Sequence, residues 1–521
     1  MTVRPLAHPW HLQRVLTICG TEKSDRTETT IGTLTDTVLL HIFDFYRKNH
    51  EDYLGPVWTW HVLVHVCQRW RQLVYASPNH LKLQILCTSR TPVRENLGIW
   101  PAFPITIECR DFESDTPSND EEDNIIAALE HPDRVCRIML DVPGPQLAKM
   151  VTVMQEPFPV LTELIIASAD EDVQALPSKF LGGSAPCLQK LGIHDIPYPA
   201  LPTLLLSTTN LITLKLVISS PRGYFSPETI VGCLSALPKL ETLAIEFDSE
   251  SDFPRPDQIH LPPVTRIVLP ALTLFQFEGA GAYLEDLVAQ IDGPQLNKMH
   301  IFYLDQVVDA PVAQLPKFVD RSVGPKLTLL NHGDVRFASD ITSFTMSYYH
   351  PETVSFISLE GLDWQASRIA ELLGQFSTTE ILSNVVHLRL RAEFQSETDD
   401  VEWLHLFQQF SAVQSLEVSQ ELAVCVALVL EGITGEMVTK VLPSLNLIYL
   451  AGRSASSVEK FVAARELSDR PVTVVDTITE FSEKLESSGV SKYQLQVLYE
   501  EPTDEIWSGS EFDDAESDVS E

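Results

Sequence analysis

Residues 211–216, Leu-Ile-Thr-Leu-Lys-Leu, carry the pattern that decides the fold of this 521-residue chain. Leu214 and Leu216 are two residues apart, so on a β-strand their side chains point to the same face. Leu211, three residues earlier, falls in the turn that leads into the strand. The hexapeptide therefore predicts a short strand with one buried face, and Lys215 on the opposite face.

The same spacing recurs ten times between residues 161 and 450. Successive copies begin 27, 23, 29, 32, 24, 58, 31, 28 and 32 residues apart, and the interval of 58 is interpreted as two units with a weak copy near Leu327. A repeat of about this length is typical of leucine-rich repeats. The copies are Leu161-Leu164-Ile166, Leu188-Leu191-Ile193, Leu211-Leu214-Leu216, Leu240-Leu243-Ile245, Leu272-Phe275-Phe277, Leu296-Met299-Ile301, Val354-Ile357-Leu359, Val385-Leu388-Leu390, Val413-Leu416-Val418 and Leu445-Ile448-Leu450.

Helical spacing replaces this pattern between the predicted strands. Ser226 is placed to cap a helix that begins with Pro227, and apolar residues follow at positions 230, 231, 234 and 237. Prolines such as Pro159, Pro238 and Pro443 stand before a copy, where they end the preceding helix. One unit is therefore strand, loop, helix and loop, and it needs stacked neighbours to bury its apolar face.

The predicted fold class is α/β, with an irregular leucine-rich-repeat solenoid over residues 131–498. Parallel strands form its concave face and helices its convex face. We expect irregularity because the position that usually holds a buried Asn or Cys holds Ala169, Ile196, Ser219 and Asp248 instead. By alternation, the residues expected to face a partner protein are Glu163, Lys190, Lys215, Glu241 and Arg389.

The formal net charge of the chain is -35, and it is unevenly placed. Residues 1–110 carry a net charge of +3, whereas residues 124–498 carry -21. An acidic array repels phosphate backbones, which argues against nucleic-acid binding and favours a basic protein partner. The alternative is that the acidic surface only keeps a large repeat protein soluble.

Eight cysteines are scattered singly, without a Cys-x-x-Cys pair, which is typical of a reducing compartment. The sequence contains no apolar run long enough to suggest a membrane span and no signal-peptide pattern, so we expect a cytoplasmic or nuclear location. Gly279-Ala280-Gly281 lacks the third glycine of a dinucleotide loop. We predict no catalytic, cofactor or metal site.

Residues 31–80 differ from the array, because large apolar and aromatic residues recur there at helical spacing. Two or three short helices are predicted, the first capped by Thr35 or Asp36. The segment contains Leu34-Thr35, then Val38-Leu39-x-x-Ile42-Phe43, and later Val66-Cys67-Gln68-Arg69-Trp70-Arg71-Gln72-Leu73.

These motifs resemble the F-box, although Thr35 replaces its usual proline and the spacer over residues 47–56 is long. The resemblance implies docking to the Skp-type adaptor of a cullin-RING ubiquitin ligase. The residues that match adaptor-binding positions are Leu34, Leu39, Ile42, Phe43 and Trp70. The alternative is that these side chains form the internal core of a small helical bundle.

An F-box followed by leucine-rich repeats resembles the substrate-recognition subunits of these ligases, in particular the fungal members. The implied partners are the Skp-type adaptor with its cullin complex and a protein substrate, which the charge suggests is basic. Two other hypotheses stay open: a repeat scaffold without ligase coupling, and an enzyme with a site in the irregular region 305–350.

The remaining segments complete the predicted organisation. Residues 1–30 form a poorly ordered leader, and residues 31–80 the F-box-like helical module. Residues 81–130 connect the module to the array and include an acidic hinge at 111–123. Residues 499–521 carry ten acids and no bases, which predicts a disordered tail.

Overall fold

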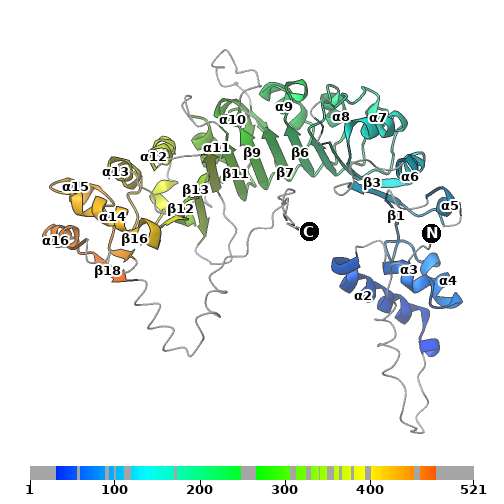
Figure 1. Ribbon diagram of the computed structural model, residues 1–521, viewed down its shortest axis with the longest axis horizontal. Helices are drawn as coiled ribbons and strands as arrows, with labels where there is room; N and C mark the ends of the chain where they lie inside the picture. Colours follow the sequence, from blue (N-terminus) through cyan, green and yellow to red (C-terminus); the bar gives the residue numbers. More distant parts are fainter. Residues whose placement is uncertain are drawn as a thin grey trace, which may run out of the picture. The chain divides into compact units, whose positions relative to one another are not determined.

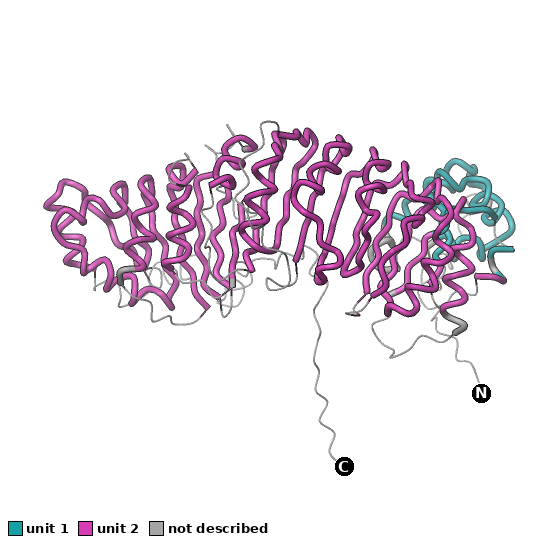
Figure 2. Tube along the Cα trace, turned by 90° about the horizontal axis from the view of Figure 1, so that it is seen from above, with its two compact units in different colours: residues 1–86, 95–105 teal, residues 87–94, 106–521 magenta. Residues whose placement is uncertain are grey.

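The computed structural model describes residues 31–54, 59–88, 93–98, 101–110, 119–168, 170, 173–247, 266–304, 313–323, 330–338, 341–348, 357–362, 366–376, 381–393, 400–450 and 458–476. The predicted leader, most of the predicted hinge and the predicted tail lie outside these residues. The chain divides into two compact units (Figure 2). Unit 1 comprises Met1–Leu86 and Glu95–Ile105, and unit 2 comprises Cys87–Arg94 and Thr106–Glu521.

Unit 1 is mainly helical. It contains the 3-10 turn η2 (Ile31–Thr33) and helices α2 (Asp36–Leu54), α3 (Thr59–Val64) and α4 (Gln68–Ala76). Thr35 caps α2, because its Oγ1 accepts the backbone N–H of Val38 at 3.4 Å. Arg69 on α4 donates to the Asp36 carboxylate at 2.7 Å and to the Leu34 carbonyl at 2.6 Å. These bonds fasten α4 to the first turn of α2.

The interior of unit 1 is built on aromatic contacts. Phe43 is fully buried, and its ring centroid lies 4.7 Å from that of Trp70. Trp60 packs edge-on against Phe103 at 5.7 Å and donates its Nε1–H to the Gln84 carbonyl at 3.0 Å. Burying apolar rings while giving the indole N–H a partner is how a small module retains stability.

Unit 2 is dominated by one sheet of 16 strands in the order β1-β2-β3-β4-β5-β6-β7-β9-β11-β14-β13-β12-β15-β16-β17-β18. The strands are β1 (Ile85–Cys87), β2 (Ile105–Arg110), β3 (Val135–Asp141), β4 (Glu163–Ala167), β5 (Lys190–His194), β6 (Thr213–Ile218), β7 (Thr242–Phe247), β9 (Leu274–Gly279), β11 (Lys298–Tyr303), β12 (Leu330–Phe337), β13 (Ile341–Tyr348), β14 (Ile357–Leu362), β15 (His387–Ala392), β16 (Ser415–Val418), β17 (Leu447–Leu450) and β18 (Thr473–Asp476). The boundary between the two units falls once within β1 and once within β2. A separate parallel pair joins β8 (Ile267–Val268) to β10 (Ile291–Asp292).

The repeat spacing positions the core as predicted. Where successive copies lie on neighbouring strands, their second residues are in register, as in Leu191, Leu214 and Leu243 on β5, β6 and β7. The copies on β14 and β15 are the exception, because β13 and β12 lie between them. In all ten copies the second and third residues lie on strands and are buried. The first residue is buried in nine of the ten copies. In the remaining copy it is Val354, which lies outside the described residues. Adjacent copies therefore form continuous apolar rows through the array.

Helices cover one face of this sheet in unit 2 (Figure 1). They are α6 (Asn119–Leu129), α7 (Gly144–Val153), α8 (Leu201–Ser207), α9 (Pro227–Leu234), α10 (Gly281–Val288), α11 (Leu315–Val323), α12 (Ala366–Gln375), α13 (Asp400–Gln408), α14 (Gln420–Gly432), α15 (Met437–Lys440) and α16 (Glu459–Leu467). Short 3-10 turns are η3 (Phe180–Gly183), η4 (Pro221–Gly223) and η7 (Leu382–Asn384), and the small helix α5 (Val93–Leu97) crosses the unit boundary. The opposite face, here named the open face, carries no helix among the described residues.

The predicted cap of α9 is confirmed. Ser226 Oγ accepts the N–H of Thr229 at 3.4 Å, and Pro227 is the first helical residue. The N-cap side chain thus satisfies one of the backbone donors that a helix start leaves without a partner. Because the helix begins where the sequence places it, the buried face of α9, with Ile230 and Leu234, meets the sheet.

The expectation of a wholly parallel sheet is wrong in one place. The 58-residue interval does not contain two successive parallel units, because β14 rather than β12 pairs with β11. β13 is antiparallel to both β12 and β14, and β12 pairs in parallel with β15. The weak copy near Leu327 is followed by β12, which starts at Leu330 and has a register shift between Leu330 and His332.

Strands also extend the sheet beyond the predicted limits. β1 and β2 lie in the stretch 81–130 that was expected only to connect the two parts, and α6 begins at Asn119, inside the expected hinge. β3 and β18 add a strand on either side of the ten copies. The ends of the array are therefore built from the same strand pairing as its centre.

A buried arginine holds the turn that precedes β17. Arg465 on α16 is fully buried and donates to the carbonyls of Val438 at 2.9 Å and Leu445 at 2.8 Å. A third bond, at 3.4 Å, goes to the carbonyl of Leu442, whose φ of 45° lies in the left-handed region. The guanidinium thus satisfies backbone acceptors in a turn that would otherwise bury them without donors.

Candidate protein-interaction surfaces

Helix α2 presents three large apolar side chains to solvent. Val38, Ile42 and Phe45 are 42%, 40% and 67% exposed. They are four and three residues apart, so they share one side of the helix. We name this set the exposed α2 face. Ile31 and Val66 of the same unit are also exposed. A cluster of apolar side chains left in water usually marks a surface that binds another protein.

The structure separates the five residues that were matched to adaptor-binding positions. Ile42 is on the exposed α2 face, and Leu34 is half-buried. Leu39 and Phe43 are fully buried, so they belong to the core of unit 1 and not to its surface. Trp70 is half-buried against Phe43. The F-box-like residues are thus divided between an inner and an outer side of the helices.

Phe45, the most exposed member of this face, was not among the residues predicted from the sequence to bind an adaptor. The available signal was its spacing, because Phe45 continues the side of α2 that carries Val38 and Ile42, while Leu39 and Phe43 form the other side. A pattern with apolar residues on two sides of a helix leaves open which side is buried until the neighbouring helices are placed.

Ion pairs cross the strands on the open face of unit 2. Arg137 on β3 lies 3.2 Å from the Glu163 carboxylate on β4, and Lys215 on β6 lies 3.0 Å from the Glu246 carboxylate on β7. Farther along, β15 supplies Arg389, which pairs with Glu417 at 3.0 Å, and Arg391, which pairs with Asp334 at 2.8 Å. Such partly exposed pairs add little stability, but they fix which charges a partner meets.

Four of the five predicted partner-facing residues lie on the open face: Glu163, Lys190, Lys215 and Arg389. Glu241 does not lie on a strand. It is exposed, but it precedes β7 and its carbonyl accepts the N–H of Thr273 at 2.8 Å. The register places Thr242 in the row that contains Lys190 and Thr213, so the alternation was assigned one residue too early.

The open face is charge-balanced from β3 to β17, unlike the array as a whole. In the described part of these strands, the open face carries seven basic and seven acidic side chains. The acidic surplus of the array therefore lies outside this surface. The basic residues are Arg137, Lys190, Lys215, Lys298, Arg336, Arg389 and Arg391, and the acidic residues are Asp141, Glu163, Glu246, Glu278, Asp334, Glu360 and Glu417. Net charge alone therefore does not describe what a partner of the open face encounters.

Three histidines on the open face, His194, His332 and His387, have a lowered pKa. Burial lowers the pKa of His194 to about 4, and the positive charge of Lys215 acts in the same direction. Burial also lowers the pKa of His332 to about 4, with contributions from His387 and Arg389. The ring centroids of His332 and His387 lie 4.7 Å apart with the ring planes tilted by 37°, and His387 Nδ1 lies 2.6 Å from the Ser415 hydroxyl.

These pKa shifts predict that acid destabilises the array. A histidine whose pKa is lower in the folded than in the unfolded state adds stability above pH 6.5, and this stability is lost as the pH falls from 6.5 towards 4. Urea unfolding at pH 7 and pH 5 should show a loss on the order of 1 kcal/mol for each of His194 and His332, less than the full pKa shift would give because solvent screens both partly exposed rings. A His194→Gln, His332→Gln variant should lose much of this dependence, whereas His405→Gln, at an exposed position on α13, should retain it. An equal pH dependence in all three proteins would contradict the assignment.

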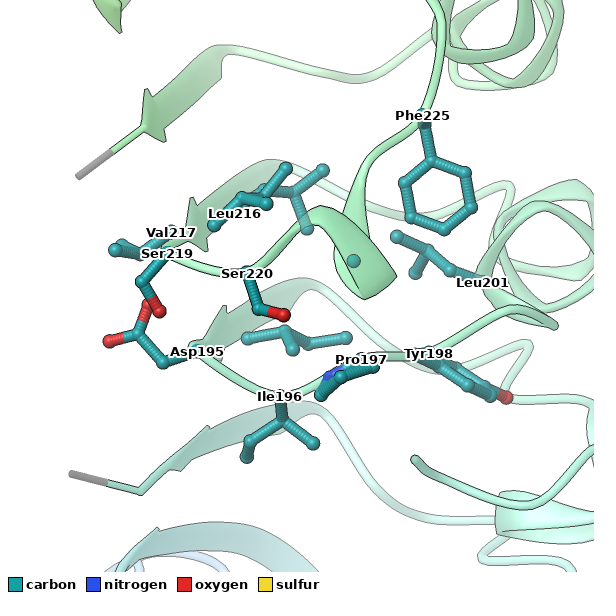
Figure 3. A pocket seen from close by; sticks show the side chains of 13 residues that line it. Asp195, Ile196, Pro197, Tyr198, Leu201, Leu216, Val217, Ser219, Ser220 and Phe225 are labelled. Atoms are coloured by element: carbon teal, nitrogen blue, oxygen red, sulfur yellow. The ribbon is translucent and has the colours of Figure 1, made fainter. Parts of the chain in front are cut away.

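A pocket between the carboxyl ends of β5 and β6 is too small for a substrate. Its volume is about 20 Å³, which is room for a single water molecule. Figure 3 shows its apolar walls, including Leu201 and Phe225, and its polar side, with Asp195 and Ser220. In the described part of the chain, no group of three or more His, Cys, Asp or Glu side chains is arranged to hold a metal ion. The described helices also include none with the length and apolar character needed to cross a membrane.

No protein-family model matches the chain. No curated protein matches it in sequence. Among solved structures, the chain is similar to the leucine-rich repeat-containing protein LegL7 from Legionella pneumophila, with 14% sequence identity and a TM-score of 0.23. The match covers 65% of this chain and 92% of LegL7. The repeat character of this chain rests on its own strand order, register and buried rows, and this architecture indicates a protein-interaction scaffold.

Proposed function

We propose that this chain is the substrate-recognition adaptor of a Skp-cullin-F-box type ubiquitin ligase. In this proposal unit 1 docks to a Skp-type adaptor, and the open face of unit 2 binds a protein substrate. The chain performs no chemistry itself. Its contribution is to hold the substrate at a high effective concentration near a ubiquitin-charged enzyme. Such a complex would act in the cytoplasm or the nucleus.

The exposed α2 face is the observation that carries this proposal. The Val66–Leu73 segment and the Val38–Phe43 segment resemble an F-box in sequence, and Val38, Ile42 and Phe45 on α2 remain exposed. An apolar helix side is a common recognition element, because a partner groove can take up anchors at helical spacing. Burying such anchors typically dominates the binding energy of an interface.

The test is titration of purified Skp-type adaptor into the full-length chain by isothermal calorimetry. Replacing Ile42 and Phe45 by aspartate should weaken binding by at least about tenfold, because each change places a charge where an apolar contact is required. Val424→Asp is the matched control, since Val424 is 61% exposed on α14 in unit 2 and should leave binding unchanged. Absence of binding by the folded native chain would reject ligase coupling.

A scaffold without ligase coupling is the second candidate, and one observation favours it. Leu39 and Phe43 are fully buried, so the internal core of unit 1 already accounts for part of the F-box-like pattern. Thr35 at the usual proline position caps α2, which gives this residue a role within the module. The calorimetric titration separates the two candidates, because only the ligase adaptor requires the Skp-type partner.

A further inference from the structure

We infer that the open face across β3, β4, β5, β6, β7 and β9 binds one amphipathic α-helix of a partner protein, with the basic edge of that helix directed towards the carboxyl ends of the strands. The inference rests on the proposed function only in taking unit 2 as the substrate-binding part. The helix would lie across the strands, along the middle row of open-face residues. That row is Met139, Ile165, Gly192, Lys215, Ala244 and Gln276, which the strand register aligns side by side.

The middle row forms a floor of low relief. Ala244 is only 1% exposed although it is on the open face, and Gly192 has no side chain. A methyl group added to Gly192 would lie 3.4 Å from His194 Nε2 and 3.4 Å from a side-chain carbon of Ile165. The side chains of Ile165 and His194 therefore border the glycine closely and leave no deep hollow there. The result is a shallow, largely apolar surface that fits the rounded side of a helix.

Lys215 does not interrupt this floor with a projecting charge. Its register partner on β7 is Ala244, but its Nζ reaches the carboxylate of Glu246, two residues farther along that strand, at 3.0 Å. The methylene groups of Lys215 therefore run diagonally across β7 and leave only about a third of the side chain exposed. A lysine stem in this position contributes apolar contact area to the floor.

The two rows beside the floor differ in charge. The row nearer the start of the strands contains Arg137, Glu163 and Lys190, two bases and one acid. The row nearer the carboxyl ends contains the acids Asp141, Glu246 and Glu278, and its histidine, His194, is neutral. A helix with a basic edge is attracted to the second row. This asymmetry selects a partner with lysines or arginines along one edge of its apolar side.

Strand spacing favours a helix over an extended peptide. Neighbouring strands are about 4.8 Å apart, and one turn of α-helix rises about 5.4 Å, so roughly one partner residue per turn can meet each strand. Alternate residues of an extended segment are about 6.7 Å apart and lose this correspondence after a few strands. The six strands span about 24 Å, which corresponds to a helix of about 16 residues.

The test uses fluorescein-labelled synthetic peptides of about 16 residues and the full-length chain, with binding followed by fluorescence anisotropy in about 0.15 M NaCl. The first peptide has a leucine stripe at helical spacing and lysines along one edge. The second has glutamates in place of the lysines, and the third is a scrambled version of the first without a stripe. We expect the first to bind at least about tenfold more tightly than either of the others.

Variants of the chain locate the contact. Ile165→Asp should weaken binding of the first peptide by at least about tenfold, and Asp141→Asn with Glu278→Gln by about threefold or more. The controls change the same charges elsewhere: Val424→Asp on α14, and Glu459→Gln with Glu466→Gln at exposed positions on α16. Circular dichroism and the unfolding midpoint of each variant verify that it is folded.

Equal binding of the striped and scrambled peptides, or equal losses in the test and control variants, would overturn the inference in favour of unspecific attraction to an acidic protein. No Skp-type adaptor is present in this experiment. The Ile42→Asp, Phe45→Asp variant should bind the first peptide like the native chain. Failure of the helix-binding inference is therefore distinguishable from failure of the proposed ligase function.

Discussion

Replacing Leu214 by alanine is expected to lower the free energy of unfolding of the array by about 2 to 5 kcal/mol. Leu214 is fully buried on β6, between its register partners Leu191 on β5 and Leu243 on β7. The truncation removes apolar contacts and leaves a cavity that neighbouring strands close only in part. Urea unfolding followed by far-UV circular dichroism measures the effect.

The adjacent residue supplies the control for this prediction. Lys215→Ala removes a partly exposed ion pair on the open face and should cost about 1 kcal/mol or less. Because each repeat contacts mainly its neighbours, hydrogen exchange in Leu214→Ala should accelerate first in β5, β6 and β7. A cost below about 0.5 kcal/mol for Leu214→Ala would mean that the strand register is incorrect.

Arg465→Met is the second change with a large expected effect, a loss of about 3 kcal/mol or more in unfolding free energy. Methionine keeps much of the side-chain volume but donates no hydrogen bond. The change leaves the carbonyls of Val438 and Leu445 buried without their donors, at about 1 to 3 kcal/mol each. It also releases the turn at Leu442, which the same guanidinium holds in a left-handed conformation.

Arg470→Met is the matched control for Arg465→Met. Arg470 donates to the carbonyls of Thr439 at 3.2 Å and Pro443 at 3.1 Å, in the same turn, but its side chain is exposed. Water can replace those bonds, so the expected loss is about 1 kcal/mol or less. Arg465→Lys should fall between the two, because an ammonium cannot reproduce the planar fork of donors. Equal losses for Arg465→Met and Arg470→Met would contradict the role of burial.

The strands of the array could be predicted because alternation reports burial directly. In Leu211–Leu216 and the other copies, each inward position is apolar, and packing in the stacked array leaves no other face to bury. The start of α9 was predictable for a similar reason, since Ser226 and Pro227 act through local backbone geometry. Local chemistry is sufficient where the determining contacts lie within a few residues.

Other features depend on contacts that no local pattern records. Phe43 and Phe45 are both large and apolar, yet one is fully buried and the other is 67% exposed, because the placement of α3 and α4 decides which side of α2 is covered. Arg465 lies in a helical pattern typical of a surface position, and its burial follows from carbonyl groups 20 and 27 residues away. The assignment of Glu241 was wrong by one residue, because Thr242 is the residue of this copy that the register aligns with Lys190 and Thr213.

The exchange of β12 and β14 in the sheet has a consequence for how the chain is assembled during synthesis. Leu243 on β7 meets its partner Phe275 after 32 residues, whereas Met299 on β11 waits 58 residues for Ile357 on β14. β12 leaves the ribosome first, but two strands, β14 and β13, separate its place in the sheet from β11. One edge of β11 therefore has no partner strand while β12 and β13 are synthesised. Stepwise strand pairing from the amino terminus stops at β11 until β14 is available. Closing this longer loop costs more chain entropy. The pairs that β14 and β13 form with their neighbours are therefore expected to form late and to join the two halves of the array.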